Sequence, residues 1–342
     1  MARIQPDRRA TITDVADAAG VSIKTVSRVF NDEPNVRPQT RDRVLEAAKG
    51  LDYHPNVAAR SLAGRRSFLI GLAYENPSPN YVVDLQNGAV ERTRGTRWRL
   101  LFLPYADTEI VSGRMQAIAR ASGLDGLILA PPLCDDPATL ADLEQSGIPY
   151  VRIAPTRDGS AAPDIRVDDR AATIALIERL IGLGHRRIAI VRGDPTHGSA
   201  AERAEGFAEA MAAHHLQVDP ALDAQGYYTF ASGLEAGRRL LSLEERPTAV
   251  FACNDDMAAG VLSAAHEAGI AVPDALSIAG YDDSNIASVV WPRLTTVRQP
   301  IFDMARAAAD ELLALIEGEE PARHAVFPYE LMVRGSTGPA PI

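Results

Sequence analysis

Hydrogen-bond donors gather on one face of a short predicted helix near the start of the chain, within residues 11–31, TITDVADAAGVSIKTVSRVFN. Ser22 can cap this helix, and its inner face would hold the apolar side chains of Val26, Val29 and Phe30. The outer face then presents one apolar side chain and four donors, namely Ile23, Lys24, Thr25, Ser27 and Arg28. Donors beside an apolar contact are what the reading of base edges in a DNA major groove requires.

A preceding helix must hold this face in position. We expect Thr13 to cap it, with Asp14 in its first turn, where a negative charge suits the helix dipole, and with Ala18 and Ala19 on its apolar face. Gly20 then permits the left-handed backbone of a sharp turn. The pattern predicts a helix-turn-helix, and a plain helical hairpin without a DNA-binding role is the alternative.

The charge of the chain is distributed unevenly. The net charge is -10, yet residues 1–66 hold 12 of the 35 Lys+Arg and 8 of the 45 Asp+Glu, so this part carries +4 and the remainder -14. A basic head on an acidic body is expected when only one end of a protein touches phosphates.

Two further segments follow the predicted helix pair. A third helix is expected from Pro38, and residues 53–67, YHPNVAARSLAGRRS, then form a short segment with little apolar surface. A helix of this length is marginal in water and needs a partner. Ala58 and Ala59 would let two copies approach, and Leu62, without an evident core partner, fits a wedge in the DNA minor groove. An ordinary interdomain linker is the alternative.

From Ser67 onward, apolar runs alternate with helical stretches. Such runs are typical of strands buried on both faces of parallel sheets. They are too many for one sheet, so we expect two doubly wound subdomains with a ligand between them, beyond the carboxyl ends of the strands. The runs are SFLIGLAY, WRLLFLPYA, DGLILAPP, IPYVRIAP, HRRIAIVRG, TAVFACN and LSIAGYDD.

Polar and aromatic side chains follow several of these runs. Carboxylates, an amide, a guanidinium and aromatic faces suit a neutral polyol, which needs hydrogen bonds to pairs of hydroxyl groups and stacking on its C–H face. For any one of these residues, a structural helix cap is the alternative. The residues are Tyr74, Asn76, Tyr81, His197, Ser199, Arg203, Tyr227, Tyr228, Asn254, Asp255, Asp282 and Asp283.

Motifs for catalysis and metal binding are missing from the sequence. There is no GxGxxG after the first apolar run, no GxxxxGK[ST], no GxSxG and no HExxH. Cys134 and Cys253 are far apart, without a CxxC or a Cys/His cluster, so we expect neither a disulfide nor a zinc site. We therefore expect no catalytic residues, no cofactor and no metal.

Targeting and membrane segments are not expected either. Residues 1–14 have no apolar core of signal-peptide length, and the chain has no run of about 18 apolar residues. The sequence indicates a cytoplasmic protein that does not contact a membrane.

The chain resembles the LacI/GalR family of bacterial transcription regulators along nearly its whole length. TITDVADAAGVSIKTVSRVFN, TRDRVLEAAKGLDYHPNVAARSLAG, DGLIL, GHRRIAIVRG, PTAVFACND, GYDD and LTTVRQP occur in family order. The resemblance implies an all-α helix-turn-helix head at 1–52, a hinge helix and linker at 53–66, and an α/β periplasmic-binding-protein-like body at 67–342 made of two doubly wound parallel-sheet subdomains. The N-subdomain would comprise about 67–167 and 296–328, and the C-subdomain about 168–295 and 329–342.

The resemblance also implies roles for individual residues. Base readers would be Ile23, Lys24 and Arg28, and contacts to phosphate or DNA backbone would come from Ser22, Thr25, Ser27, Asn31, Tyr53 and Asn56. Leu62 resembles the minor-groove wedge of the family, with Ala59 beside it. Effector contacts would come from Tyr81, Asp168, His197, Ser199, Arg203, Tyr228, Asn254 and Asp282. Asp169 stands where Asn is common in the family.

The function that this resemblance implies is a homodimeric repressor. It would bind a pseudopalindromic operator through two heads and release or hold it in response to a small-molecule effector, with a carbohydrate first and a nucleobase next among the candidates. An activator or a regulator that depends on a co-repressor is an alternative within the same class. A sugar-binding receptor without DNA function is the alternative from another class, and residues 11–64 argue against it.

Overall fold

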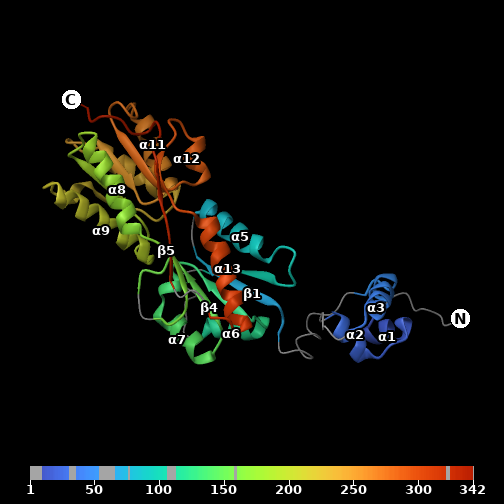
Figure 1. Cartoon of the computed structure of the whole chain (residues 1–342). Helices are drawn as coiled ribbons and strands as arrows, with labels where there is room; N and C mark the ends of the chain where they lie inside the picture. Colours follow the sequence, from blue (N-terminus) through green and yellow to red (C-terminus); the bar gives the residue numbers. More distant parts are fainter. Residues whose placement is uncertain are drawn as a thin grey trace. The chain divides into compact units, whose positions relative to one another are not determined.

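The computed structural model describes residues 10–30, 36–53, 66–75, 78–105, 113–157, 160–320 and 324–341. The chain divides into two compact units, Met1–Ser67 and Phe68–Ile342, and each is described by itself (Figure 1). Most of the segment expected to form the hinge helix lies outside the described residues. No helix within the described ranges is long and apolar enough to cross a membrane.

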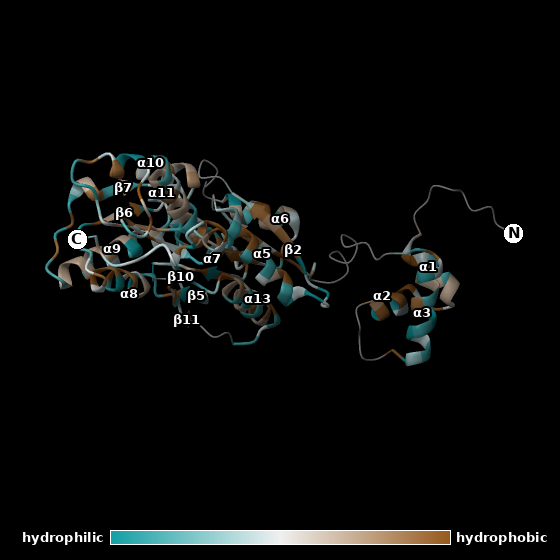
Figure 2. Ribbon diagram, turned by 90° about the horizontal axis from the view of Figure 1, so that it is seen from above, coloured by the Kyte–Doolittle hydropathy of each residue, from teal (hydrophilic) through white to brown (hydrophobic). Residues whose placement is uncertain are grey.

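Three helices form the first unit: α1 (Ile12–Ala19), α2 (Ile23–Phe30) and α3 (Pro38–Gly50). Their apolar faces meet in a small buried core that includes Val15, Val26, Val29 and Val44. These helices contain both brown, hydrophobic residues and teal, hydrophilic residues, as expected for amphipathic helices that pack on one face (Figure 2). Helices α1 and α2 and the tight turn between them confirm the predicted helix-turn-helix.

The cap of α1 differs from the prediction. Thr11, not Thr13, is the N-cap, because Thr11 and Asp14 form a capping box. The Asp14 backbone N–H donates to Thr11 Oγ1 at 3.4 Å, and the Thr11 backbone N–H donates to Asp14 Oδ2 at 2.7 Å. Gly20 has φ 63°, the left-handed backbone predicted for the turn.

The N-subdomain of the second unit is built on a parallel sheet with strand order β11-β5-β4-β3-β1-β2. Helices α5 and α13 cover one face of this sheet, and α6 and α7 cover the other (Figure 1). The strands are β1 (Leu69–Tyr74), β2 (Arg99–Pro104), β3 (Gly126–Leu129), β4 (Tyr150–Ile153), β5 (Asp164–Val167) and β11 (His324–Phe327). The helices are α5 (Pro79–Thr93), α6 (Arg114–Ser122), α7 (Pro137–Ser146) and α13 (Ile301–Glu317).

The C-subdomain has a second sheet with strand order β12-β10-β9-β8-β6-β7, in which only β12 runs antiparallel to its neighbour among the described strands. Helix α8 packs on α9, and α10 packs on α11. The strands are β6 (Ile188–Arg192), β7 (Asp223–Gln225), β8 (Ala249–Ala252), β9 (Ser277–Asp282), β10 (Thr295–Arg298) and β12 (Glu330–Met332). The helices are α8 (Asp169–Gly182), α9 (Gly198–Ala213), α10 (Phe230–Leu241), α11 (Asp255–Glu267) and α12 (Asn285–Val289).

The second crossing between the subdomains lies later than expected. The resemblance implies that the N-subdomain resumes at about residue 296, but β10 pairs with β9 and β12, with Thr296 opposite Gly280 and Met332. The chain therefore crosses only after Arg298, and α13 is the first element on the other side. The other two crossings lie between β5 and α8 and between β11 and β12.

Each of the seven predicted apolar runs contains a strand, which confirms those predictions. Five further strands of the described chain, β5, β7, β10, β11 and β12, were not predicted. They are short, and their sequences DIRV, DAQ, TTVR, HAVF and ELM mix polar with apolar residues. All five lie at or next to a sheet edge, where burial on both faces is not required, so no apolar run marks them.

Close packing of α5 on α13 gives a test of the fold. Gly88 on α5 faces the backbone carbonyl of Phe302 on α13, and a Cβ added at Gly88 would overlap that oxygen. We expect Gly88→Ala to lower the free energy of unfolding by about 1–3 kcal/mol, because the backbone cannot yield as a side chain does. Urea unfolding measures this. Gly182→Ala, on α8 with open space around the added atom, is the matched control and should be neutral or stabilising by up to about 1 kcal/mol.

Candidate functional site

A cavity lies between the two subdomains, beyond the carboxyl ends of strands from both sheets. Ala154 follows β4, Asn254 follows β8, Asp282 ends β9 and Gln299 follows β10. Parallel strands direct these positions to the same edge of each sheet, which is why residues so distant in sequence meet. The lining residues are Tyr81, Pro131, Ala154, Asp169, His197, Ser199, Arg203, Tyr228, Asn254, Asp282 and Gln299.

Seven of the eight predicted effector residues line this cavity, and Asp168 does not. Asp168 is exposed and caps α8, where its Oδ1 accepts a hydrogen bond from the Ala171 backbone N–H at 2.8 Å. The next residue, Asp169, is buried and faces the cavity instead. Asp168 therefore serves as a helix cap, and its role as an effector contact stays a prediction.

Arg203 lies at the centre of the site and is 4% exposed. Its Nε donates to Asp169 Oδ1 at 2.7 Å, and its Nη1 donates to the Cys253 carbonyl at 2.5 Å. Nη1 also lies 3.7 Å from Asp282 Oδ1, and the guanidinium carbon lies 3.7 Å from the centre of the Tyr281 ring. A buried cation needs such surroundings, and here two carboxylates, a carbonyl and an aromatic face supply them.

Asp282 has an unusual backbone and an unusual carboxyl group. Its φ is 106°, a region that side chains rarely adopt, and Tyr228 and Ala154 in the same cavity have φ of 59° and 49°. Backbone strain of this kind collects at functional sites. Burial raises the pKa of Asp282 to about 7, against the opposing effect of Arg203, and Gln299 Nε2 donates to Asp282 Oδ1 at 2.6 Å.

Asn254 and His197 have both structural and cavity-facing positions. Asn254 caps α11, with its Oδ1 accepting from the Met257 backbone N–H at 2.9 Å, while its Nδ2 donates to the Tyr228 carbonyl at 3.0 Å. The His197 ring packs against the Tyr228 ring at a centroid distance of 5.3 Å. Burial raises the pKa of the Tyr81 and Tyr228 hydroxyl groups, so both stay neutral and can donate to a ligand.

Direct contacts between the subdomains frame the cavity. Ser78 Oγ donates to Asp256 Oδ2 at 2.6 Å, and His197 Nε2 lies 3.1 Å from Glu75 Oε2. Gly198, the first residue of α9, lies so close to Thr156 that a Cβ added there would overlap the threonine side chain. Glycine is therefore required for this approach of the two subdomains. The partners in these contacts have no common motif, so the sequence does not predict them.

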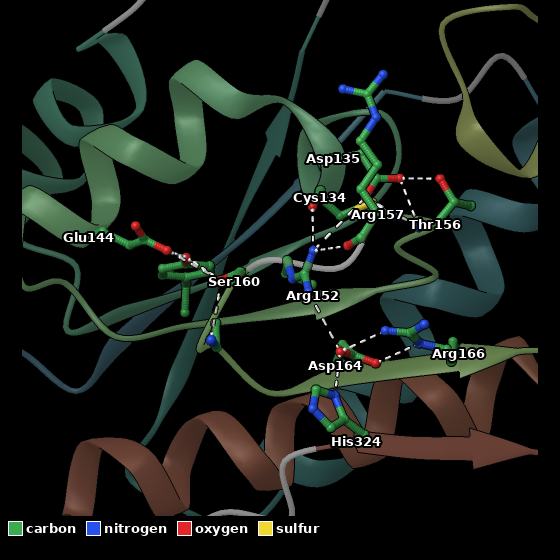
Figure 3. A network of polar contacts seen from close by, with 12 residues as sticks. Cys134, Asp135, Glu144, Arg152, Thr156, Arg157, Ser160, Asp164, Arg166 and His324 are labelled. Carbon is green, nitrogen blue, oxygen red and sulfur yellow. Dashed lines mark hydrogen bonds and ion pairs between the residues drawn. The ribbon is translucent and has the colours of Figure 1, made fainter.

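A network of polar contacts holds the Thr156 side of the cleft (Figure 3). Asp135 Oδ2 accepts from the backbone N–H and the hydroxyl of Thr156, each at 2.9 Å. Arg152 on β4 is 1% exposed. Its Nη1 lies 3.9 Å from Asp135 Oδ1, and its Nη2 lies 3.5 Å from Asp164 Oδ2. Burial alone would raise the pKa of Asp164, but hydrogen bonds from Arg166 and His324 lower it below its ordinary value. The network ties β4, β5 and β11 to the loop that touches α9.

Chemistry other than binding has little support in the described part of the chain. No group of three or more His, Cys, Asp or Glu side chains there could hold a metal ion. Cys134 and Cys253 are buried free thiols, and burial raises the pKa of Cys253 to about 12. Neither thiol is a nucleophile at neutral pH.

The DNA-facing residues predicted in the head lie where the helix periodicity put them. Ile23, Lys24 and Arg28 are exposed on α2, with Ile23 48% exposed, while Val26 and Val29 are buried. Ser22 Oγ accepts from the Thr25 backbone N–H at 3.1 Å, as a cap should. Thr25, Ser27 and Tyr53 are half-buried, and the Tyr53 ring packs against Phe30 at 5.7 Å. Asn31, Asn56, Ala59 and Leu62 lie outside the described residues.

The raised pKa of Asp282 predicts a pH-dependent stability. Between about pH 4 and pH 7, Asp282 is protonated in the folded protein and ionised in the unfolded chain. The folded state therefore loses stability as the pH rises through this range. We expect wild type to lose up to about 1.4 kcal/mol per pH unit relative to Asp282→Asn in this range, and the difference to be constant above about pH 8. Urea unfolding of both proteins at each pH measures this; a difference independent of pH would contradict it.

Comparison with known proteins identifies the two units. Residues 11–56 match the family of bacterial regulatory proteins of the lacI family, and residues 177–337 match the periplasmic binding protein-like domain. The chain is 33% identical to the probable HTH-type transcriptional repressor ExuR of Bacillus subtilis (strain 168), over 95% of this chain and 98% of that protein. It is 31% identical to catabolite control protein A of Priestia megaterium, over 96% of this chain and 99% of that protein.

Solved structures give the same result. The lac repressor dimer bound to operator and the anti-inducer ONPF matches with a TM-score of 0.85 and 29% identity, over 97% of this chain and 100% of that chain. The complex of the transcriptional regulator CelR with cellobiose matches with a TM-score of 0.71 and 31% identity, over 96% of this chain and 100% of that chain. These relatives are transcription regulators, not enzymes. The resemblance seen in the sequence is thereby confirmed, and the chain belongs to the lacI family of DNA-binding transcription regulators with an effector-binding domain.

Proposed function

We propose that the protein is a homodimeric repressor whose affinity for a pseudopalindromic operator is controlled by a sugar bound between its two subdomains. The observation that carries this proposal is the cavity itself, since polar side chains from both subdomains converge on it. A ligand that touches both subdomains can favour one relative position of the two, which is the requirement for a regulator.

A carbohydrate fits the chemistry of the cavity. Asp282, Asn254 and Arg203 combine acceptors and donors that match pairs of sugar hydroxyl groups. The Tyr81 and Tyr228 rings offer faces for the C–H side of a pyranose. Two relatives support the class: the CelR structure contains cellobiose, and the structure of a LacI family regulator from Enterococcus faecium, 26% identical over 79% of this chain, contains ribose.

The head would read DNA through α2. Ile23, Lys24 and Arg28 are exposed on one face of this helix and are proposed to contact base edges. Contacts to phosphate or DNA backbone are proposed for Ser22, Thr25, Ser27, Asn31, Tyr53 and Asn56, and Leu62 with Ala59 is proposed to enter the minor groove. The lac repressor structure, a dimer on its operator, supports two heads on two half-sites.

Coupling between the sites would work through the contacts that close the cleft. The subdomains are joined by the contacts of Ser78 with Asp256 and of Glu75 with His197. A ligand that changes the spacing of the subdomains would therefore change the conformation of the segment that leads to the head. The coupling is reciprocal: a sugar that weakens operator binding tenfold is itself bound tenfold more weakly on operator, which corresponds to about 1.4 kcal/mol.

Replacement of Lys24 tests the base-reading proposal. We expect Lys24→Ala to relax preference at particular half-site positions, by about 1–3 kcal/mol there, with little change elsewhere. Competition binding with operators substituted at each position measures this. Lys49→Ala, an exposed lysine on α3, removes the same charge and should leave base preference unchanged. A uniform weakening by Lys24→Ala across all sequences would make Lys24 a phosphate contact.

Replacement of Arg203 tests the effector site. Gel-shift titration with DNA upstream of the protein's own or neighbouring genes, with and without a panel of sugars, should show one sugar that releases the operator. We expect Arg203→Ala to bind operator but to lose the sugar response at least tenfold, because the cation at the centre of the cavity is gone. Arg170→Ala is the control: Arg170 also joins α8 to α9, through Glu205 and Glu209, but at the surface. A sugar that tightens operator binding would identify a co-repressor instead.

A further inference from the structure

The effector cavity has an unusual balance of charge. Among its described lining residues, the carboxylate of Asp169 and the carboxyl group of Asp282, whose pKa burial raises to about 7, face a single guanidinium, that of Arg203. All three side chains are buried, with exposures of 6%, 8% and 4%. His197, the other lining residue that can carry a positive charge, lies against the carboxylate of Glu75. The cavity therefore offers a ligand no positive charge that is not already balanced.

The partners of Arg203 also restrict how its guanidinium can meet a ligand. Nε donates to Asp169, Nη1 donates to the Cys253 carbonyl, and one face of the group lies on the Tyr281 ring. A ligand carboxylate or phosphate binds an arginine through two adjacent N–H groups. To reach the Nε side of Arg203, an anionic ligand would have to displace Asp169, and it would then leave a buried carboxylate without its partner.

The start of α8 explains how Asp169 comes to hold this position. Asp168 caps the helix through the Ala171 backbone N–H, so the carboxylate of Asp169 is not needed for capping. Asp169 is the first residue of the helix and reaches across to Arg203 on α9. The two adjacent aspartates therefore have different positions: Asp168 caps the start of the helix in solvent, and Asp169 faces the cavity.

We propose that Asp169 sets the charge selectivity of the cavity, so that the effector is an uncharged sugar and sugar acids and sugar phosphates are rejected. This proposal rests on the proposed function, since it concerns the ligand of the same cavity. Arg203 then acts as a donor to sugar hydroxyl groups, and Asp169 prevents it from binding an anion. An isolated structural role for Asp169, as an ion pair between α8 and α9, would not affect which ligand charge is accepted.

The first experiment does not depend on the identity of the sugar. Inorganic phosphate is titrated at constant ionic strength against wild type and Asp169→Asn, and the thermal unfolding midpoint is recorded. Asparagine keeps the shape and the acceptor oxygen but removes the charge, so we expect phosphate to stabilise Asp169→Asn and not wild type, with at least a tenfold difference in apparent affinity. Adding Arg203→Ala to the variant should abolish the effect.

Asp168→Asn is the matched control. It removes the same charge one residue away, and asparagine still caps a helix, so we expect this variant to bind phosphate no better than wild type. Phosphate stabilisation of wild type that requires Arg203 would overturn the proposal. So would a folded Asp169→Asn, shown by its operator binding, that gains no phosphate affinity.

The second experiment uses sugars in matched pairs: glucose with glucuronate, galactose with galacturonate and mannose with mannuronate. By calorimetry, wild type should prefer the neutral member of any pair that binds, and Asp169→Asn should shift the preference toward the acid at least tenfold. Tighter binding of a sugar acid by wild type would overturn the proposal. If no sugar binds any of these proteins, the carbohydrate part of the proposed function fails, while the phosphate titration still tests Asp169.

Discussion

A guanidinium taken out of water has to be surrounded by acceptors, and this constraint organises the cavity between the subdomains. Arg203 is nearly fully buried on α9, and the groups that satisfy it come from three other places: the start of α8, the end of β8 and the end of β9. The Tyr281 ring covers one of its faces. Since removing any of these partners would leave charge uncompensated in a low-dielectric site, the elements that carry them are fixed relative to one another.

The same cavity is where the two subdomains touch. The described contacts between them include polar ones, as between Ser78 and Asp256, and the approach of α9 to Thr156 is close enough to require Gly198. The polar network around Asp135 holds Thr156 from behind (Figure 3). Separation of polar contacts such as these exposes little apolar surface to water.

Much of the architecture could be read from the order of residues. The seven apolar runs each contain a strand, and the helix-turn-helix begins and ends near the expected residues, because helix caps, turn glycines and apolar periodicity act over a few residues. The short strands were not predicted, because such local signals are absent from their sequences. β5 and β10 owe their place to neighbouring strands, and nothing within four residues marks them.

The sequence alone indicated which residues meet at the cavity wherever a strand end carries a polar side chain, as at Asn254 and Asp282, since parallel strands bring their ends to one edge. It could not indicate that Asp169 faces the cavity and Asp168 caps the helix, because adjacent residues of the same type differ only in the direction that the helix start gives them. Nor could it pair Ser78 with Asp256, which are 178 positions apart. Such contacts depend on how two independently folded sheets are placed, and no local pattern in the chain encodes that placement.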